Sequence, residues 1–153
     1  RFLELLLRPR IGYIYSRNGN LEDWPVRGHF GPKAMLINGW SGSGGDALPF
    51  GFKILEAGPI VGTRTVGALI GNSTGHNTID GGGHTVLGGR IMGRNGKWFM
   101  EGHGVEPDYK VINDPSELAR GTDQQMDKAI ELLLEELEKN PVLEMVHPPF
   151  EKR

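Results

Sequence analysis

The chain of 153 residues contains no cysteine, so it has neither a disulfide framework nor a thiolate site, which fits a reducing compartment. It has no apolar run near the ~20 residues that span a bilayer, and its first residues lack the features of a signal peptide. It also lacks an excess of one charge, because 17 Lys and Arg face 19 Asp and Glu, a formal net charge of −2. Neither a membrane nor a nucleic-acid partner is expected.

Glycine, in contrast, is abundant. The chain has 24 glycines, well above the usual share of about 7%, and most lie between Gly28 and Gly104. A length of 153 residues suffices for one domain with a buried core. The chain starts without Met, and its first eight residues, RFLELLLR, are typical of the end of an amphipathic helix that Pro9 stops. We therefore expect a chain truncated upstream.

Apolar periodicity and turn residues predict short strands with two main helices. The expected strands cover residues 12–15, 34–37, 60–62, 84–92, 97–100 and 109–112, with 84–92 and 97–100 forming an antiparallel pair around the turn at 94–96. One expected helix covers 46–57. The other begins at a capping box of Thr122 and Gln125 and ends at Asn140. Polar or irregular loops are expected over 20–32 and 63–71.

Ser43 is the leading candidate for a nucleophile, in the segment NGWSGSGGDALPF of residues 38–50. Glycines on both sides permit a sharp turn from strand to helix, where the amide of Gly44 could donate to an oxyanion. A plain structural turn is the alternative interpretation. Ser41 is a rival that strand alternation would turn to a different side. The elbow motif G-x-S-x-G fits neither serine.

Two other patterns predict cofactor sites less well. Gly39 and Gly44 have the spacing of a phosphate-binding loop, but the lysine that should follow is missing and Asp46 would repel phosphate. His76 and His84 flank Asp80 at intervals of four, which would suit a metal only on a helix, and the glycines around them disfavour one. We expect no metal and no cofactor.

Glu101 and His103 form a further candidate pair in FMEGHGVEPDYKV, residues 99–111. A carboxylate just after an apolar strand could orient a catalytic histidine, as acids do in serine-hydrolase triads. A solvated turn closed by Pro107 is the alternative interpretation.

Several motifs occur together in one order along most of the chain. They are RPRIGYIYSRNGN, GPKAMLINGWSGSGGDALPFGF, GPIVGTRTVGALIG, DGGGHTV, EGHGVEPD and NDPSELARGTDQQMDKAIELL with its PPF tail. With these motifs the chain resembles the C-terminal catalytic region of tricorn-type proteases, relatives of the tail-specific or carboxy-terminal processing serine proteases. The resemblance implies that residues 1–153 are the C-terminal part of such a catalytic domain. The implied fold is α/β, a crotonase-like or Clp protease-like sandwich of short strands and helices.

The resemblance also implies roles for site residues. The serine of the family's G-S-x-G-D motif is the nucleophile, which falls on Ser43, and the next residue, Gly44, supplies an oxyanion amide. The glutamate of a Ser-His-Ser-Glu tetrad falls on Glu101, whereas His103 matches a structural position.

The stretch after T-R-T is similar to one that lies along an extended peptide substrate. Leu69, Ile70 and Gly71 are thus expected to bind the substrate backbone as an added strand would. The family's usual Trp and Gly in this stretch are Val66 and Ala68 here, so the resemblance does not define the shape of this wall.

The resemblance places the tetrad's histidine and second serine upstream, outside this chain. Without that base, Ser43 is not deprotonated efficiently and the isolated chain should be inactive as a protease. The implied partners are a peptide substrate, the upstream segment of the same protein and further copies in a homo-oligomer, in the cytoplasm. Two alternatives are a noncatalytic peptide-binding module and a crotonase-type acyl-CoA enzyme.

Overall fold

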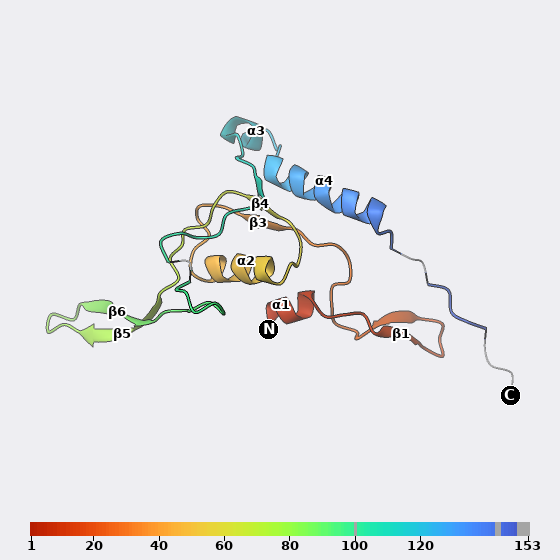
Figure 1. The fold of residues 1–153 in the computed structure, drawn as a ribbon, viewed down its shortest axis with the longest axis horizontal. Helices are drawn as coiled ribbons and strands as arrows, with labels where there is room; N and C mark the ends of the chain where they lie inside the picture. Colours follow the sequence, from red (N-terminus) through yellow and green to blue (C-terminus); the bar gives the residue numbers. More distant parts are fainter. Residues whose placement is uncertain (100, 143–144, 150–153) are drawn as a thin grey trace.

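A small parallel sheet with a helix on each side forms the centre of the computed structural model, which describes residues 1–99, 101–142 and 145–149 (Figure 1). The strands are β3 (Met35–Ile37), β4 (Ile60–Gly62) and β7 (Tyr109–Lys110), in the order β3-β4-β7. Helix α2 (Gly44–Ile54) lies on one side of them and α4 (Gln124–Lys139) on the other (Figure 1). The prediction of an α/β fold is confirmed, and its crotonase-like or Clp-like form stays a prediction.

The three strands pair in parallel, so their carboxyl ends meet at one edge of the sheet. Ile37 pairs with Gly62 there, and Gly62 has φ 131°. A Cβ at Gly62 would lie 1.9 Å from the Ile37 carbonyl oxygen, so this close approach of two backbones requires glycine. The strand predicted over 60–62 has the observed bounds, while β7 ends two residues before the predicted 112.

The hydrophobic core joins α2 to the sheet. Its buried members are Ile37, Phe52, Ile60 and Val105. Helix α1 (Phe2–Leu6) packs Leu3 and Leu6 against this cluster, which confirms the apolar helix expected before Pro9. Helix α2 starts two residues before the predicted 46 and ends three before the predicted 57.

Helix α4 begins at a different cap from the predicted one. Asp123, rather than Thr122, is the N-cap, and its carboxylate accepts from the amides of Gln125 and Met126 at 3.1 and 3.0 Å. Aspartate is at least as good an N-cap residue as threonine, so Asp123 can cap the helix in place of Thr122. A short helix, α3 (Pro115–Ala119), precedes it.

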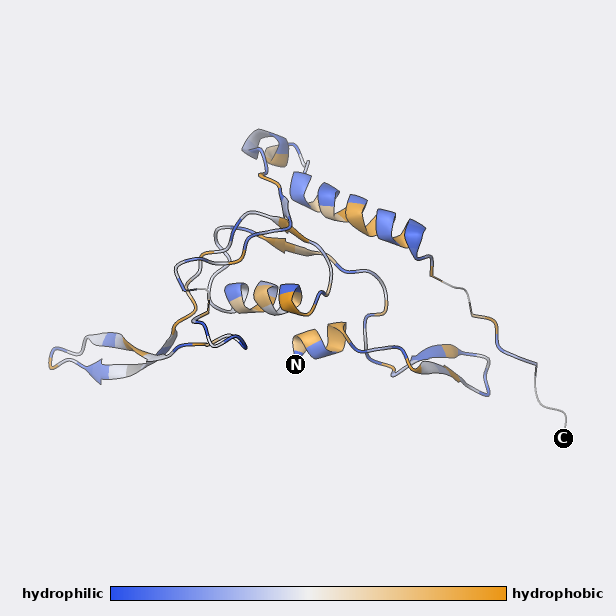
Figure 2. Cartoon of the chain, in the orientation of Figure 1, coloured by the Kyte–Doolittle hydropathy of each residue, from blue (hydrophilic) through white to orange (hydrophobic). Residues whose placement is uncertain are grey.

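The apolar stripe of α4 is only partly covered. Ala129 is buried, but Met126, Ile130 and Leu134 are 46%, 46% and 56% exposed. Figure 2 shows apolar and hydrophilic patches alternating along this helix. The apolar face of α4 is therefore wider than the part of the helix that packs on β3 and β4. No helix among the described residues has the length and apolar character to cross a membrane.

Two antiparallel hairpins flank the centre. The first pairs β1 (Gly12–Tyr15), which has the predicted bounds, with β2 (Leu21–Trp24). The predicted polar loop up to Pro32 is thus wrong at its start, because the turn at Asn18 and Gly19 brings the four residues of β2 back onto β1.

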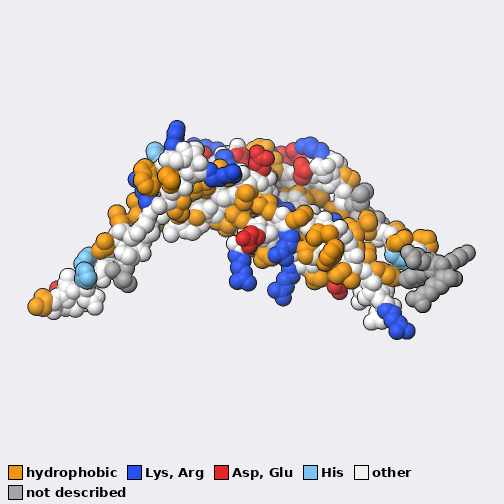
Figure 3. All heavy atoms as spheres, turned by 60° about the horizontal axis from the view of Figure 1, so that its bottom comes forward, with side chains coloured by type: hydrophobic (Ala, Val, Ile, Leu, Met, Phe, Trp, Pro, Cys, Tyr) orange, Lys and Arg blue, Asp and Glu red, His pale blue; other side chains and the backbone are white. Residues whose placement is uncertain are grey.

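The second hairpin pairs β5 (Gly71–Asn77) with β6 (Gly83–Gly89), and it extends as a narrow arm on the left of Figures 1 and 3. The predicted pairing of 84–92 with 97–100 is confirmed only near the turn. Met92 and Trp98 form an isolated antiparallel bridge, the Gly93 amide donates to the Lys97 carbonyl at 2.8 Å, and the Phe99 amide donates to the Ile91 carbonyl at 3.1 Å. The earlier part of the predicted strand pairs with β5 instead, and residue 100 lies outside the described residues. The glycine-rich, polar β5 lacks the alternation that identifies a strand in sequence.

Candidate active site

Ser43 stands at the turn that connects β3 to α2, at the carboxyl edge of the sheet. Asn38 shapes the turn, since its side-chain oxygen accepts from the Trp40 amide at 2.9 Å and its carbonyl from the Ser41 amide at 3.0 Å. Ser43 then serves as the N-cap residue of α2 and is exposed. Ligand sites of parallel α/β sheets lie at this edge.

The backbone of Ser43 has φ 55° and ψ −109°, a region that residues other than glycine rarely adopt. Such strain costs about 1–3 kcal/mol and gathers at functional sites. A sharp strand-to-helix turn that exposes a serine is the geometry of a nucleophile elbow. The turn therefore has this geometry although its sequence does not match G-x-S-x-G.

Gly44 follows at the first position of α2. Among the described residues its amide donates to no acceptor, and no atom lies within 4 Å of the place where a Cβ would stand. An unpaired amide at the positive end of a helix is suited to an anion. The geometry is compatible with the predicted oxyanion donor, which stays a prediction.

Ser41 is engaged within the turn. Its hydroxyl oxygen accepts from the Asn38 amide at 3.3 Å and contacts the Asn38 side-chain oxygen at 3.5 Å. Its Cβ lies 3.2 Å from the position that a Cβ on Gly45 would take. These contacts show that Ser41 stabilises the turn. Ser43 is therefore the exposed one of the two candidate serines.

Residues 64–70, which we call the bridging segment, run beside the nucleophile turn. The Ser43 amide donates to the Ala68 carbonyl at 3.0 Å, and the Val66 amide donates to the Ser41 carbonyl at 2.9 Å. The segment is thus hydrogen-bonded directly to the turn that carries the candidate nucleophile.

The other edge of the bridging segment binds residues 101–105. The Gly102 amide donates to the Gly67 carbonyl at 2.8 Å, and the Thr65 amide donates to the Val105 carbonyl at 3.1 Å. Gly67 has φ 78°, and a Cβ there would lie 2.4 Å from the Gly104 nitrogen, so the two backbones touch. The bridging segment is therefore hydrogen-bonded both to the Ser43 turn and to the residues that follow Glu101.

Glu101 binds this segment with its side chain. Its carboxylate oxygen Oε2 accepts from the Leu69 amide at 2.8 Å and from the Ile70 amide at 2.9 Å. Gly71, the next residue, starts β5 and pairs with Gly89. The amides of Leu69 and Ile70 are therefore engaged, so a substrate strand would use their carbonyls and side chains; this substrate role stays a prediction.

Asp46 has a place in the site that the sequence did not indicate; there it counted only as the first residue of the predicted helix and as a charge that would repel phosphate. Its carboxylate is fully buried. One oxygen, Oδ2, accepts from the amides of Ser43 and Ala68 at 2.9 and 3.0 Å, and Oδ1 accepts from Gly67 at 2.8 Å. The Thr65 hydroxyl donates as well. The spacing S-x-x-D at a helix start is the sequence signal that could have identified it.

These contacts set the charge of Asp46. Burial alone would raise the pKa of its carboxyl, but the four hydrogen bonds outweigh burial and hold that pKa below its ordinary value. Asp46 is therefore ionised at neutral pH, at the positive end of α2.

The histidines lie apart from the serine. No hydrogen bond in the described part of the chain joins a histidine to Ser43, and the carbonyl of His103 accepts from the Arg64 guanidinium at 2.7 Å. His76 and His84 are exposed on the β5–β6 hairpin. The described residues include no group of three acids and histidines that could hold a metal.

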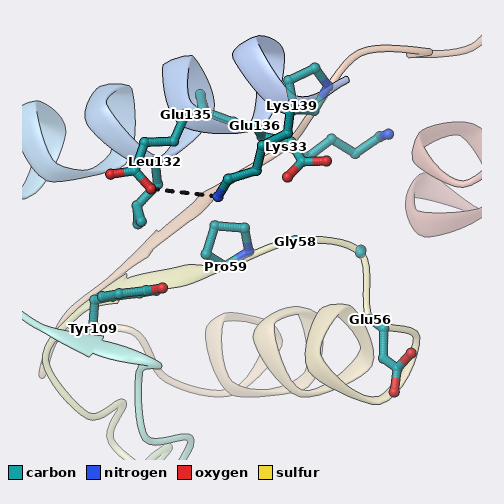
Figure 4. Close-up of a pocket in the computed structure, with 12 residues that line it drawn as sticks. Lys33, Glu56, Gly58, Pro59, Tyr109, Leu132, Glu135, Glu136 and Lys139 are labelled. Atoms are coloured by element: carbon teal, nitrogen blue, oxygen red, sulfur yellow. Dashed lines mark ion pairs between the residues drawn. The ribbon is translucent and has the colours of Figure 1, made fainter. Parts of the chain in front are cut away.

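A cleft of about 400 Å³ lies between α4 and the sheet at the amino ends of the strands, opposite the edge that carries Ser43 (Figure 4). Both of its lysines are engaged: Lys139 pairs with Glu135 at 3.9 Å, and Lys33, whose pKa burial lowers, donates to the Gly31 carbonyl at 2.9 Å. Its position and pairing make it a structural cleft rather than part of the candidate site.

An exposed serine at a strained strand-to-helix turn, with an unpaired amide beside it, is the arrangement of a serine hydrolase. The profile of peptidase family S41 matches residues 11–111, and the chain belongs to this family. It is 36% identical over 143 residues to the tricorn protease of Thermoplasma volcanium. It is 35% identical over 139 residues to tricorn protease homolog 1 of Streptomyces coelicolor. These alignments cover 90% and 91% of the chain and confirm the resemblance.

A solved structure agrees. The crystal structure of the tricorn protease superposes with a TM-score of 0.83 at 35% identity, over 89% of this chain and 13% of that one. A peptidase structure from Parabacteroides merdae, at 20% identity and a TM-score of 0.58, shares the fold. The chain spans 13% of the length of the Thermoplasma and Streptomyces relatives.

Proposed function

We propose that this chain is the nucleophile-bearing region of a serine peptidase that cleaves oligopeptides through a Ser-His-Ser-Glu tetrad. One observation carries the proposal: Ser43 is exposed at φ 55° beside a Gly44 amide that has no acceptor among the described residues. Membership of peptidase family S41 supports the same chemistry.

In the proposed reaction, a histidine from an upstream segment takes the proton of the Ser43 hydroxyl as its oxygen attacks the peptide carbonyl carbon. The Gly44 amide and an upstream glycine amide stabilise the oxyanion. The C–N bond then breaks, and the histidine returns the proton to the leaving amine. Water, deprotonated by the same histidine, releases the acyl group as a carboxylic acid.

Glu101 acts in this proposal through the second serine, which orients the imidazole. Its two amide contacts hold the carboxylate on the bridging segment, which is itself hydrogen-bonded to Ser43. Leu69, Ile70 and Gly71 then form the wall along which the peptide lies. The substrate, the upstream segment and a homo-oligomer in the cytoplasm are the proposed partners.

The isolated chain lacks the base in this proposal and should be inactive. Loss of a triad member typically lowers the rate on the order of 10⁴ to 10⁶-fold. Peptide cleavage by the 153-residue chain alone, at the rate of the full-length protein, would contradict a base supplied from elsewhere.

The decisive test uses the full-length protein. Ser43→Ala should abolish cleavage of a fluorogenic peptide and labelling by a fluorophosphonate, while Ser41→Ala should retain labelling. Peptide binding with no labelling of the unmutated protein would favour a noncatalytic module, and thermal stabilisation by coenzyme A would favour an acyl-CoA enzyme.

A further inference from the structure

Asp46 is a fully buried charge that the proposed reaction does not use. Burying a carboxylate is costly unless it is hydrogen-bonded. Its donors come from two separate pieces of chain: the Ser43 amide from the nucleophile turn, and the amides of Gly67 and Ala68 from the bridging segment. The carboxylate is therefore fully satisfied by groups next to the candidate nucleophile.

The two carboxylate oxygens of Asp46 accept from different donors, and together they connect the Ser43 turn to the bridging segment. Oδ2 receives the Ser43 amide and the Ala68 amide together, at 2.9 and 3.0 Å. The Ser43 amide also donates to the Ala68 carbonyl, at 3.0 Å. Ser43 is thus joined to Ala68 both directly and through Asp46, which determines the backbone position from which its hydroxyl projects.

The connection continues to the second candidate residue. Leu69 and Ile70 follow Ala68 directly, and their amides bind Glu101. A displacement of the bridging segment would therefore move the Glu101 carboxylate relative to Ser43. One buried carboxylate thus sets the spacing of both halves of the proposed site.

We propose that Asp46 is a positioning residue: it holds the strained Ser43 turn against the bridging segment, so that the hydroxyl, the Gly44 amide and Glu101 keep their reactive arrangement. The inference rests on the proposed function. An asparagine of the same shape would direct its NH₂ group at amide donors, so it cannot replace the carboxylate. The turn would then relax from φ 55° toward an ordinary conformation.

The test is Asp46→Asn in the full-length protein, with the maximal rate of phosphonylation and the inhibitor dissociation constant measured separately. We expect the maximal rate to fall on the order of 10²-fold, because a shift of about 1 Å in a reacting group has that effect. The dissociation constant should change less than about threefold, since the groups that bind the inhibitor remain.

Asp108→Asn is the matched control. Asp108 also accepts from a backbone amide, that of Ile60 at 2.9 Å, and pairs with Lys53 at 2.8 Å, but it contacts no part of the nucleophile turn. It should lower stability while leaving the maximal rate per folded molecule unchanged. An equal loss of rate in both variants would assign Asp46 a general structural role and overturn the inference.

Thr65 offers a milder perturbation should Asp46→Asn fail to fold. Its hydroxyl donates to Asp46 and accepts from the Val105 amide at 2.7 Å. Thr65→Val should lower the maximal rate, and Thr65→Ser, which keeps the hydroxyl, should restore it. Full rate in Asp46→Asn or Thr65→Val would refute the positioning role while leaving the function intact; absence of labelling in the unmutated protein would refute the function itself.

Discussion

The contact between the bridging segment and residues 102–105 gives a sharp prediction for Gly67→Ala. Gly67 has φ 78°, and an added Cβ would lie 2.4 Å from the Gly104 nitrogen and 2.8 Å from the His103 nitrogen. Both neighbours are backbone atoms, so relief requires the two segments to separate. Gly102 is a matched control, because it has φ 77° and no atom within 4 Å of its added Cβ.

Comparing the two variants distinguishes the cost of backbone strain at positive φ from the cost of steric overlap of the added Cβ. A left-handed conformation at a residue other than glycine costs about 1–2 kcal/mol, so Gly102→Ala should lose that much stability. Gly67→Ala bears the same strain plus the overlap, which typically costs a further 1–3 kcal/mol or so. Moving the segments apart also weakens the hydrogen bond from the Gly102 amide to the Gly67 carbonyl, 2.8 Å long.

Urea unfolding of the purified protein measures the difference, and amide hydrogen exchange at Val105 reports whether the contact opens. We expect Gly67→Ala to be less stable than Gly102→Ala by about 1–3 kcal/mol, with faster exchange at Val105. If the two variants have equal stabilities within about 0.5 kcal/mol, the bridging segment and residues 102–105 are not in contact in solution. The arrangement of Glu101 relative to Ser43, which depends on that contact, would then be wrong as well.

Three further predictions concern helix ends and acid. Glu56 ends α2 at φ 50°, so Glu56→Gly should stabilise the fold by about 1 kcal/mol in thermal or urea unfolding; a loss would contradict the strained cap. Asp123→Ala should cost about 1 kcal/mol and Thr122→Ala much less, since Asp123 caps α4; the reverse order would restore the predicted capping box. Because the folded pKa of Asp46 lies below its ordinary 3.8, its stabilisation is present above about pH 4 and lost as pH falls through the folded value. The stability gap to Asp46→Asn should therefore narrow between pH 6 and pH 3, and a constant gap would contradict the ionised carboxylate.

Sequence patterns predict several short elements correctly. β1 and β4 have their predicted bounds, because short β-rich runs bounded by turn residues leave little choice. Ser43 was placed at the start of a helix, where the structure has it. What the sequence could not supply was strand pairing: β2 has only four residues and β5 is polar and glycine-rich, so only their partner strands identify them as strands.

In the candidate site, too, the local features can be predicted from the sequence and the long-range contacts cannot. The nucleophile turn is a local feature, readable from glycines and a serine between strand and helix. The contacts of Asp46 with Gly67 and Ala68, and of Glu101 with Leu69 and Ile70, join residues 21 to 32 positions apart. Such long-range contacts follow from the parallel pairing of the sheet, so they required the fold.

Mass spectrometry of the labelled protein can identify the nucleophile. The full-length protein is labelled with a fluorophosphonate, digested and mapped. We expect a single adduct on the Ser43 hydroxyl, and no adduct when the protein is denatured before labelling. An adduct on Ser41, or none on residues 38–50 in a protein that still cleaves peptides, would contradict the assignment of Ser43 as the nucleophile.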